Sequence, residues 1–166
     1  MKWVLGVQMV NVETLLYILK GNKVLLIHKK RGLGKGLYNG VGGKVEANES
    51  VEEAAIRECL EEIGVRPKNI EWMGLLEFWN NNNLYGYVHV FIANDFEGNP
   101  KETAEAKPIW FKISEIPYDN MWGDDVYWLP LVLNGKKILG RFWFIDWKII
   151  IRKEVYLLNE SISDLK

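Results

Sequence analysis

The chain has 166 residues, of which 48% are hydrophobic and 26% are charged, and its net charge at pH 7 is −1. This composition is typical of one globular domain, and a charge near zero without a Lys/Arg-rich block argues against nucleic acid polymers and membrane surfaces as partners. We expect one cytoplasmic domain over residues 1–166, because the apolar stretches are too short to span a membrane and no signal segment is visible. A single cysteine cannot form an internal disulfide and suits a reducing compartment.

The first predicted elements are two β-rich runs at 14–20 and 23–29. Gly21 and Asn22 separate them by the two residues of a tight turn, so the pattern predicts a β-hairpin. The segment 31–43 that follows is rich in glycine and shows no periodicity. It therefore predicts a loop that leads into the next element.

The next element is the dominant helix of the sequence. Ser50 and Glu53 fit a capping box at its start, and Gly64, followed by Pro67, ends it. Apolar residues at helical spacing predict the face that anchors this helix to a core. These residues are Ile56, Cys59, Leu60 and Ile63.

After this helix the chain alternates between β-rich runs and turn residues. Four consecutive asparagines at 80–83 bridge the first two runs, and Pro130 weakens the helical pattern of a later segment. The pattern as a whole predicts a mixed α/β fold. The predicted elements are strands at 72–79, 84–93 and 108–112, a short helix at 124–133, and a late strand pair at 138–147 and 148–158.

One string between Gly43 and Val65, with the pattern G-x5-E-x7-R-E-x-x-E-E-x-G, concentrates acidic residues. At about 100° per residue, Glu58, Glu61 and Glu62 lie on one side of the helix, opposite its apolar face. These like charges repel one another in the last turns, where the helix dipole also disfavours them. A cation that prefers oxygen ligands, such as Mg²⁺, would offset the repulsion. A solvated acidic face would explain Glu61 and Glu62 alone, whereas the full spacing favours a metal site.

This string resembles the signature box of the Nudix hydrolases, enzymes that cleave nucleoside diphosphates linked to another group. Every defining position matches, and Cys59 stands where an aliphatic residue is commoner. Over about residues 14–156, the chain resembles the MutT-like oxidised purine nucleoside triphosphatases, which hydrolyse 8-oxo-dGTP and 2-hydroxy-dATP. The resemblance implies the α/β/α sandwich of the Nudix fold with a mixed β-sheet. The further matching segments are Lys29-Lys30-Arg31-Gly32, Tyr38-Asn39-Gly40, Val41-Gly42-Gly43-Lys44, Met121-Trp122-Gly123-Asp124-Asp125 and Tyr127-Trp128.

The resemblance implies hydrolysis of a phosphoanhydride with Mg²⁺, for which Mn²⁺ is a possible substitute. Glu58, Glu61 and Glu62 are the implied metal ligands, together with the backbone carbonyl of Gly42. Glu105 matches a carboxylate outside the box that completes the metal site or deprotonates water, although an ordinary loop acid is the alternative. For the general base we choose Glu62, with Glu58 as the alternative.

Other residues of the box are expected to position these acids and the phosphates. Arg57 is expected to orient the carboxylates by pairing with Glu61 or Glu53, and Glu49 to fix the junction of loop and helix. Gly42 and Gly43 allow a close approach of the backbone. Lys44 and Lys29 can contact phosphates, and a generic surface lysine is the alternative for both.

Recognition of an oxidised purine calls for carboxylates and an amide, because oxidation changes the donors and acceptors on the edge of the base. The resemblance places Asn39, Asp124, Asp125 and the ring of Trp122 in that pocket. An aspartate that is protonated when buried beside the other can donate a hydrogen bond to a base carbonyl. A helix-capping acid pair and a core tryptophan are the alternatives. The resemblance adds Thr14, Leu33, Val41, Phe78 and Gly123 to the substrate-binding residues.

The leading hypothesis is hydrolysis of oxidised purine nucleoside triphosphates to the monophosphate and pyrophosphate, by a monomer or homodimer that sanitises the nucleotide pool. One alternative is a Nudix enzyme for another nucleotide or a dinucleoside polyphosphate. A second is a catalytically silent nucleotide-binding module, which would have no need of several mutually repelling acids. Isomerisation of prenyl diphosphates lacks support, because Cys59 lies on the predicted buried face.

Overall fold

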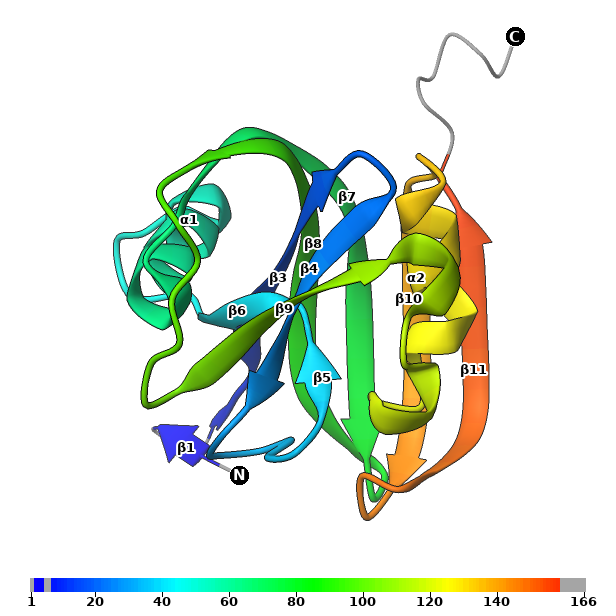
Figure 1. Cartoon of the computed structure of the whole chain (residues 1–166). Coiled ribbons are helices and arrows are strands. Elements are labelled where there is room, and N and C mark those ends of the chain that lie inside the picture. The colour runs from blue at the N-terminus through cyan, green and yellow to red at the C-terminus, as the bar shows by residue number, and fades with distance from the viewer. Residues whose placement is uncertain (1, 5–6, 159–166) are drawn as a thin grey trace, which may run out of the picture.

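Nine strands form one mixed sheet in the computed structural model, which describes residues 2–4 and 7–158 (Figure 1). Two further strands, β1 (Lys2–Val4) and β2 (Val7–Met9), form a separate antiparallel pair. Within the described residues the α-helices are α1 (Val51–Ile63) and α2 (Asp125–Leu133), and two short 3-10 helices, η1 (Ile113–Glu115) and η2 (Tyr118–Asn120), precede α2. The strands of the main sheet are β3 (Asn11–Lys20), β4 (Lys23–Lys29), β5 (Tyr38–Asn39), β6 (Val41–Lys44), β7 (Arg66–Asn80), β8 (Asn83–Glu97), β9 (Ala106–Lys112), β10 (Ile138–Ile145) and β11 (Ile149–Leu157).

The strands of this sheet follow the order β11-β10-β7-β8-β3-β4-β5, with β6 beside β3 and β9 beside β4. The pairs β3–β8 and β10–β7 are parallel, and the other pairs are antiparallel. Figure 1 shows α1 and α2 on opposite sides of the sheet. The α/β/α arrangement with a mixed sheet is therefore confirmed.

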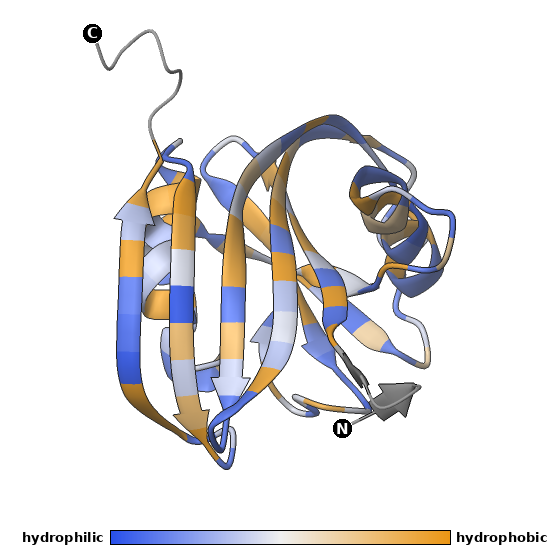
Figure 2. Cartoon of the chain, turned by 180° about the vertical axis from the view of Figure 1, so that it is seen from behind, coloured by the Kyte–Doolittle hydropathy of each residue, from blue (hydrophilic) through white to orange (hydrophobic). Residues whose placement is uncertain are grey.

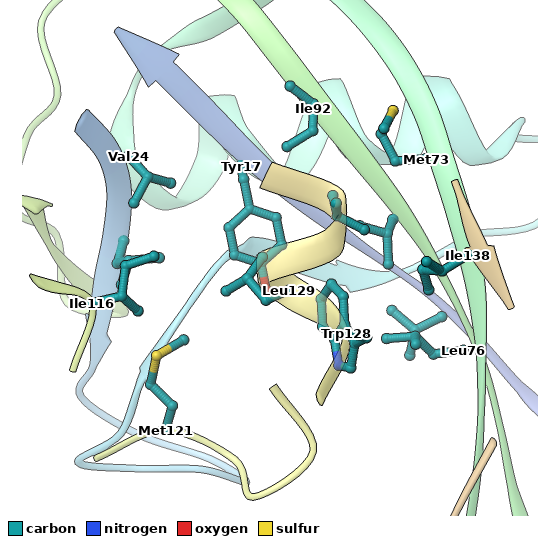
Figure 3. Packing of buried hydrophobic residues seen from close by; sticks show 14 of the residues in the cluster. Tyr17, Val24, Met73, Leu76, Ile92, Ile116, Met121, Trp128, Leu129 and Ile138 are labelled. Atoms are coloured by element: carbon teal, nitrogen blue, oxygen red, sulfur yellow. The ribbon is translucent and has the colours of Figure 1, made fainter. Parts of the chain in front are cut away.

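Side chains of β3 point alternately to the two faces of the sheet and pack in two different hydrophobic clusters. Leu16 and Ile18 pack in the cluster that includes Cys59 of α1, whereas Tyr17 packs in the cluster that includes Trp128 of α2 (Figure 3). Successive side chains of a strand point to opposite faces, so a central strand covered on both faces is apolar at every position. The outer strand β11 instead carries a hydrophilic block, Arg152 to Glu154, between its hydrophobic ends (Figure 2).

Local caps fix both ends of α1 where the sequence predicts them. The Ser50 hydroxyl accepts a hydrogen bond of 3.0 Å from the Glu53 amide, and Gly64 adopts a left-handed conformation with φ of 71°. One expectation for this helix is wrong: Leu60 is 41% exposed rather than buried. The buried stripe follows residues four apart, and Cys59 and Ile63 occupy it with Ala55, while Leu60 lies to one side.

Several predicted boundaries also need correction. β7 and β8 pair along their whole lengths, so both extend beyond 72–79 and 84–93 into polar segments. The glycine-rich segment 31–43 contains β5 and the start of β6, because pairing with β4 and β3 imposes strand structure where the sequence has no period. Likewise, β9 begins before 108 because its first residues pair with β4.

The predicted hairpin of β3 and β4, the late pair of β10 and β11, and the short helix α2 are confirmed. Pro130 lies inside α2 without ending it. Among residues 2–4 and 7–158, no helix is long and apolar enough to cross a membrane.

Candidate active site

A cavity of about 270 Å³ lies among the sheet, the end of α1 and the start of α2. Val41 and Gly123, which we expected in the substrate site, lie elsewhere: Val41 is in the core beneath α1, and Gly123 faces Ile150. All of the other predicted substrate residues line the cavity. These are Thr14, Lys29, Leu33, Asn39, Gly42, Gly43, Lys44, Phe78, Trp122, Asp124 and Asp125.

Near one end of the cavity, Glu58 and Glu62 lie one turn apart on α1, and Glu62 lines the cavity wall. Burial and the neighbouring Glu58 carboxylate raise the pKa of Glu62 to about 8. A Cβ on Gly43 would lie 2.5 Å from the Glu58 carboxylate, so only glycine leaves room for that group. A carboxylate whose pKa is raised by a neighbouring carboxylate is suited to bind a divalent cation in place of a proton.

Arg57 fixes the position of these acids. Its guanidinium donates to Glu49 at 2.7 Å, to Glu58 at 2.9 Å and to Glu61 at 3.2 Å. It also donates to the backbone carbonyl of Lys44 at 2.9 Å, which ties α1 to the end of β6. Hydrogen bonds to Glu49 and Glu58 raise the pKa of Arg57, so its charge is permanent. One fixed cation thus orients acids from the loop and from the helix.

Two predicted metal ligands lie nearer the surface. Glu61 is 60% exposed, and Glu105, which is 51% exposed, accepts a hydrogen bond from Arg31. The Glu105 charge nevertheless helps to raise the pKa of Glu62. Across the described ranges, no three His, Cys, Asp or Glu side chains gather closely enough to hold a metal. The Glu58–Glu62 pair is therefore the core of the candidate metal site.

At the other end of the cavity, Asp124 and Asp125 are both buried, with 3% and 2% of their surfaces exposed. Asp124 accepts a hydrogen bond of 2.8 Å from the Trp128 indole, whereas Asp125 Oδ2 has no hydrogen-bond partner among the residues described. Burial raises the pKa of Asp124 to about 6, and burial together with the Asp124 charge raises the pKa of Asp125 well above its ordinary value. Both carboxyls therefore retain a proton to higher pH than an ordinary aspartate does.

The hydrogen bonds at the start of α2 do not fit the alternative that this acid pair caps the helix. Asp124 occupies the N-cap position of α2, but its side chain makes no capping hydrogen bond. Its carboxylate instead bonds to Trp128, on the buried side of the helix. The two acids therefore belong to the cavity rather than to the helix terminus.

Aromatic rings enclose this end of the cavity. Trp122 contacts Phe144 and Trp147 edge-on, at centroid distances of 6.5 and 5.9 Å. A Cβ on Gly34 would lie 3.2 Å from the Trp122 indole nitrogen, so the loop before β5 closes against the same ring. Trp122 is thus held in place at the wall of a cavity, where an aromatic face can stack on a planar base.

Sequence reasoning missed several residues of the cavity wall. Tyr85 projects from an irregular pairing of strands, and Trp147 lies in a turn with φ of 53°, which is rare for a bulky residue. Glu13 precedes the run that the sequence indicated as a strand. No local pattern marked these positions. The missed lining residues are Glu13, Leu15, Ile27, Tyr85, Val88, Phe144 and Trp147.

Comparisons with known proteins agree with this geometry. The family model described as NUDIX domain matches residues 9–132. The oxidized purine nucleoside triphosphate hydrolase of Danio rerio is 42% identical over 154 residues, which span 92% of this chain and 96% of that protein. The protein of the same name from Mus musculus is 42% identical, spanning 90% and 95%. The solved structure of a MutT protein from Bacillus halodurans is similar with a TM-score of 0.79 and 26% identity, covering 88% of this chain and 97% of that one.

Proposed function

The chain belongs to the Nudix hydrolases, and from that premise we propose that it hydrolyses oxidised purine nucleoside triphosphates to the monophosphate and pyrophosphate. Water attacks the β-phosphorus in this reaction, and the activity removes damaged nucleotides from the pool of DNA and RNA precursors. The names of the Danio rerio and Mus musculus relatives support this substrate class. The observation that carries it is the buried Asp124–Asp125 pair in the cavity wall.

The chemistry of this pair matches an oxidised base. Oxidation of a purine at C8 adds a carbonyl oxygen and turns the neighbouring ring nitrogen from an acceptor into an N–H donor. Protonated Asp125 donates to a base carbonyl, and ionised Asp124 accepts from an N–H. Asn39 supplies an amide beside them, and Trp122 stacks on the ring. Specificity of this kind is strong, because a mismatched base leaves buried polar groups unpaired.

We assign the opposite end of the cavity to the phosphates and to Mg²⁺, with Mn²⁺ as a substitute. Glu58 and Glu62 hold the cation, and Glu61, Glu105 and the carbonyl of Gly42 are proposed as further ligands. A bound divalent cation neutralises phosphoryl oxygens and lowers the pKa of water. Glu62 takes the proton of the attacking water, with Glu58 as the alternative base.

Basic residues near this end position the phosphates and the acids. Lys44 lines the cavity, and its carbonyl is bonded to Arg57, which keeps Glu58 in place. The Lys29 ammonium donates to the Leu33 carbonyl at 2.7 Å, and its charge lowers the pKa of Glu62. We propose that Lys29 and Lys44 contact the phosphates. All the groups named belong to one chain, so we propose that a monomer suffices for catalysis, whether or not a homodimer forms. We place the enzyme in the cytoplasm.

A panel of nucleotides incubated with Mg²⁺ tests the proposal. The panel contains 8-oxo-dGTP, 2-hydroxy-dATP, dGTP, dATP, ADP-ribose and a diadenosine polyphosphate, and release of pyrophosphate is measured against release of phosphate. We expect pyrophosphate, with the largest kcat/KM for the two oxidised triphosphates. A preference for ADP-ribose or the diadenosine compound would show that the enzyme acts on another class of substrate. No turnover of any compound would indicate a silent nucleotide-binding module.

A further inference from the structure

We propose that Glu13 and Tyr85 form the sugar-recognition site of the cavity, in which the Glu13 carboxylate accepts a hydrogen bond from a sugar hydroxyl of the nucleotide. The inference rests on the proposed function, because it takes the ligand to be a nucleoside triphosphate. Both residues line the cavity, and neither belongs to the acid pairs at its two ends.

Glu13 lies between the two ends of the cavity. On β3 it is paired directly with Lys44 of β6, at the end assigned to the phosphates. Its carboxylate accepts a hydrogen bond from the Tyr85 hydroxyl. The Tyr85 ring meets Trp147 at a centroid distance of 5.1 Å, and Trp147 meets Trp122 at 5.9 Å, at the end assigned to the base. Contacts thus run continuously from the phosphate end to the base end, and the sugar is the part of a nucleotide that joins the two.

A β-bulge brings Tyr85 to this position. The pairing of β7 with β8 jumps from Gly86 to Leu84, which leaves Tyr85 as the extra residue. An extra residue of this kind redirects its side chain relative to the regular strand. The backbone around it is fixed, because the Asn11 amide donates to the Tyr85 carbonyl at 3.0 Å and a Cβ on Gly86 would lie 2.1 Å from the Asn11 carbonyl.

The chemistry of the pair calls for a donor on the ligand. A carboxylate near a triphosphate is repelled by it, so an acid in this place is unfavourable unless it binds a hydrogen-bond donor. A carboxylate offers about four lone-pair sites, and the Tyr85 hydroxyl occupies one of them. Sugar hydroxyls are the donors that a nucleotide carries between its base and its phosphates. Tyr85 is a positioning residue, because it holds the carboxylate that binds the hydroxyl.

The experiment combines variants of the enzyme with variants of the sugar. Nucleoside triphosphates with one oxidised base are prepared with ribose, 2′-deoxyribose, 3′-deoxyribose and 2′,3′-dideoxyribose. Steady-state kcat and KM are measured for the wild-type enzyme and for Glu13→Ala, Glu13→Gln and Tyr85→Phe. Binding of the same compounds is followed by tryptophan fluorescence with Ca²⁺ in place of Mg²⁺. Glu97→Gln and Tyr156→Phe are matched controls at exposed positions that do not line the cavity.

We expect the wild-type enzyme to lose about 10- to 100-fold in kcat/KM, through KM, when the recognised hydroxyl is removed, as for a hydrogen bond to a charged group. The 2′-deoxy and 3′-deoxy compounds identify which hydroxyl it is. Glu13→Ala should show the same loss with the intact sugar and no further loss with the dideoxy compound. Tyr85→Phe should raise KM about threefold at unchanged kcat, a smaller effect because the carboxylate remains.

An equal loss for all four sugars in Glu13→Ala, or a wild-type enzyme indifferent to both hydroxyls, would overturn the inference. If Glu13→Ala does not fold, Glu13→Gln decides, because it keeps the shape of the side chain and weakens the acceptor. The outcome separates from that of the proposed function. Binding that depends on Glu13 and the hydroxyl without any turnover would refute the function alone, whereas turnover of oxidised triphosphates without this dependence would refute the sugar site alone.

Discussion

The start of α2 and the end of α1 each contribute two acidic side chains, and the two pairs are neutralised differently. The Glu58 carboxylate helps to raise the pKa of Glu62, one turn away on α1, and the fixed charge of Arg57 lies against Glu58. Asp124 and Asp125 are adjacent in sequence and buried, and the donor to them is the neutral Trp128 indole. A cation can replace the proton of the first pair, whereas burial makes the second pair retain its proton.

The comparison teaches that the surroundings, not the residue type, decide what an acid pair does. Beside an arginine, two carboxylates are suited to bind the proposed metal. Buried among aromatic rings, two carboxylates are suited to the proposed pattern of one donor and one acceptor.

Removal of either charge of the first pair should have the largest effect. Glu58→Gln and Glu62→Gln should each lower kcat by about 10³-fold, because an amide is a poor ligand for Mg²⁺ and a poor base. Pyrophosphate release at saturating Mg²⁺ measures the loss. Glu52→Gln, on the exposed first turn of the same helix, is the control and should stay within about twofold of the wild-type enzyme. Turnover that survives both substitutions would refute the metal assignment.

Loss of Arg57 should destabilise the fold as well as the site. Arg57→Ala leaves Glu49 and Glu58 without their cation, and we expect the free energy of unfolding to fall by about 1–2 kcal/mol, because the network is only partly shielded from solvent. Urea unfolding measures the change. Arg152→Ala, which removes an exposed arginine bonded to Glu154, should cost less than about 0.5 kcal/mol. Equal effects of the two substitutions would show that the Arg57 network is no stronger than a surface ion pair.

The second pair should respond asymmetrically to substitution by asparagine. Asp124→Asn exchanges an ionised acceptor for an amide and should raise KM for oxidised purines about 10- to 100-fold. Asp125→Asn keeps a donor where the protonated carboxyl provides one, so the preference for oxidised over unoxidised purines should change by no more than about threefold. The ratio of kcat/KM values for 8-oxo-dGTP and dGTP measures both. The reverse order would show that the proton lies on Asp124.

A smaller effect concerns stability and pH. A carboxyl whose pKa is raised by folding binds its proton more tightly in the folded state, so stability is greatest at low pH and falls as pH rises through the raised pKa. Without metal, melting temperature should therefore fall as pH rises above the ordinary carboxyl pKa, with the contribution of Asp124 complete near pH 6 and that of Glu62 complete near pH 8. We expect about 2–4 °C for each kcal/mol.

Metal should separate the two contributions. Thermal unfolding from pH 5 to pH 9 with added Mg²⁺ should level off near pH 6, because the cation takes the place of the Glu62 proton, whereas without metal the fall should continue to about pH 8. Glu62→Gln should behave like the metal-bound wild-type enzyme at pH 8. Loss of both transitions on addition of Mg²⁺ would remove the distinction between the two pairs.

How far the sequence predicts this molecule depends on how local each feature is. The bounds of α1 and the geometry of Glu58 and Glu62 follow from spacing within one segment, where caps and helical periodicity suffice. The burial of both Asp124 and Asp125 does not follow from spacing, because neighbouring residues seldom face the same side; it depends on how α2 meets the sheet. Resemblance, rather than periodicity, located those two acids.

Neither residue spacing nor the family resemblance identifies Glu13 and Tyr85 as residues of the site. Their contact joins the start of one strand to a bulge in another, and a bulge is a property of pairing between strands rather than of either sequence. The sequence does not predict the strands β5 and β6 for a related reason. Gly42 and Gly43 carry no side chain, so they cannot show the alternation of hydrophobic and polar residues that indicates a strand. A Cβ on Gly42 would lie 1.7 Å from the Thr14 carbonyl oxygen. Glycine is therefore needed here because of a close contact between β6 and β3 that exists only in the folded protein.

Cys59, on the buried face of α1, bears on how the enzyme endures the conditions in which it is needed. Burial raises the pKa of its thiol to about 12, and its side chain has no exposed surface. Peroxides attack the thiolate, so a thiol that is neither ionised nor accessible resists oxidation to sulfenic acid. The chain has no other cysteine. The same oxidants that generate the proposed substrates therefore find no reactive thiol on the native protein that removes them.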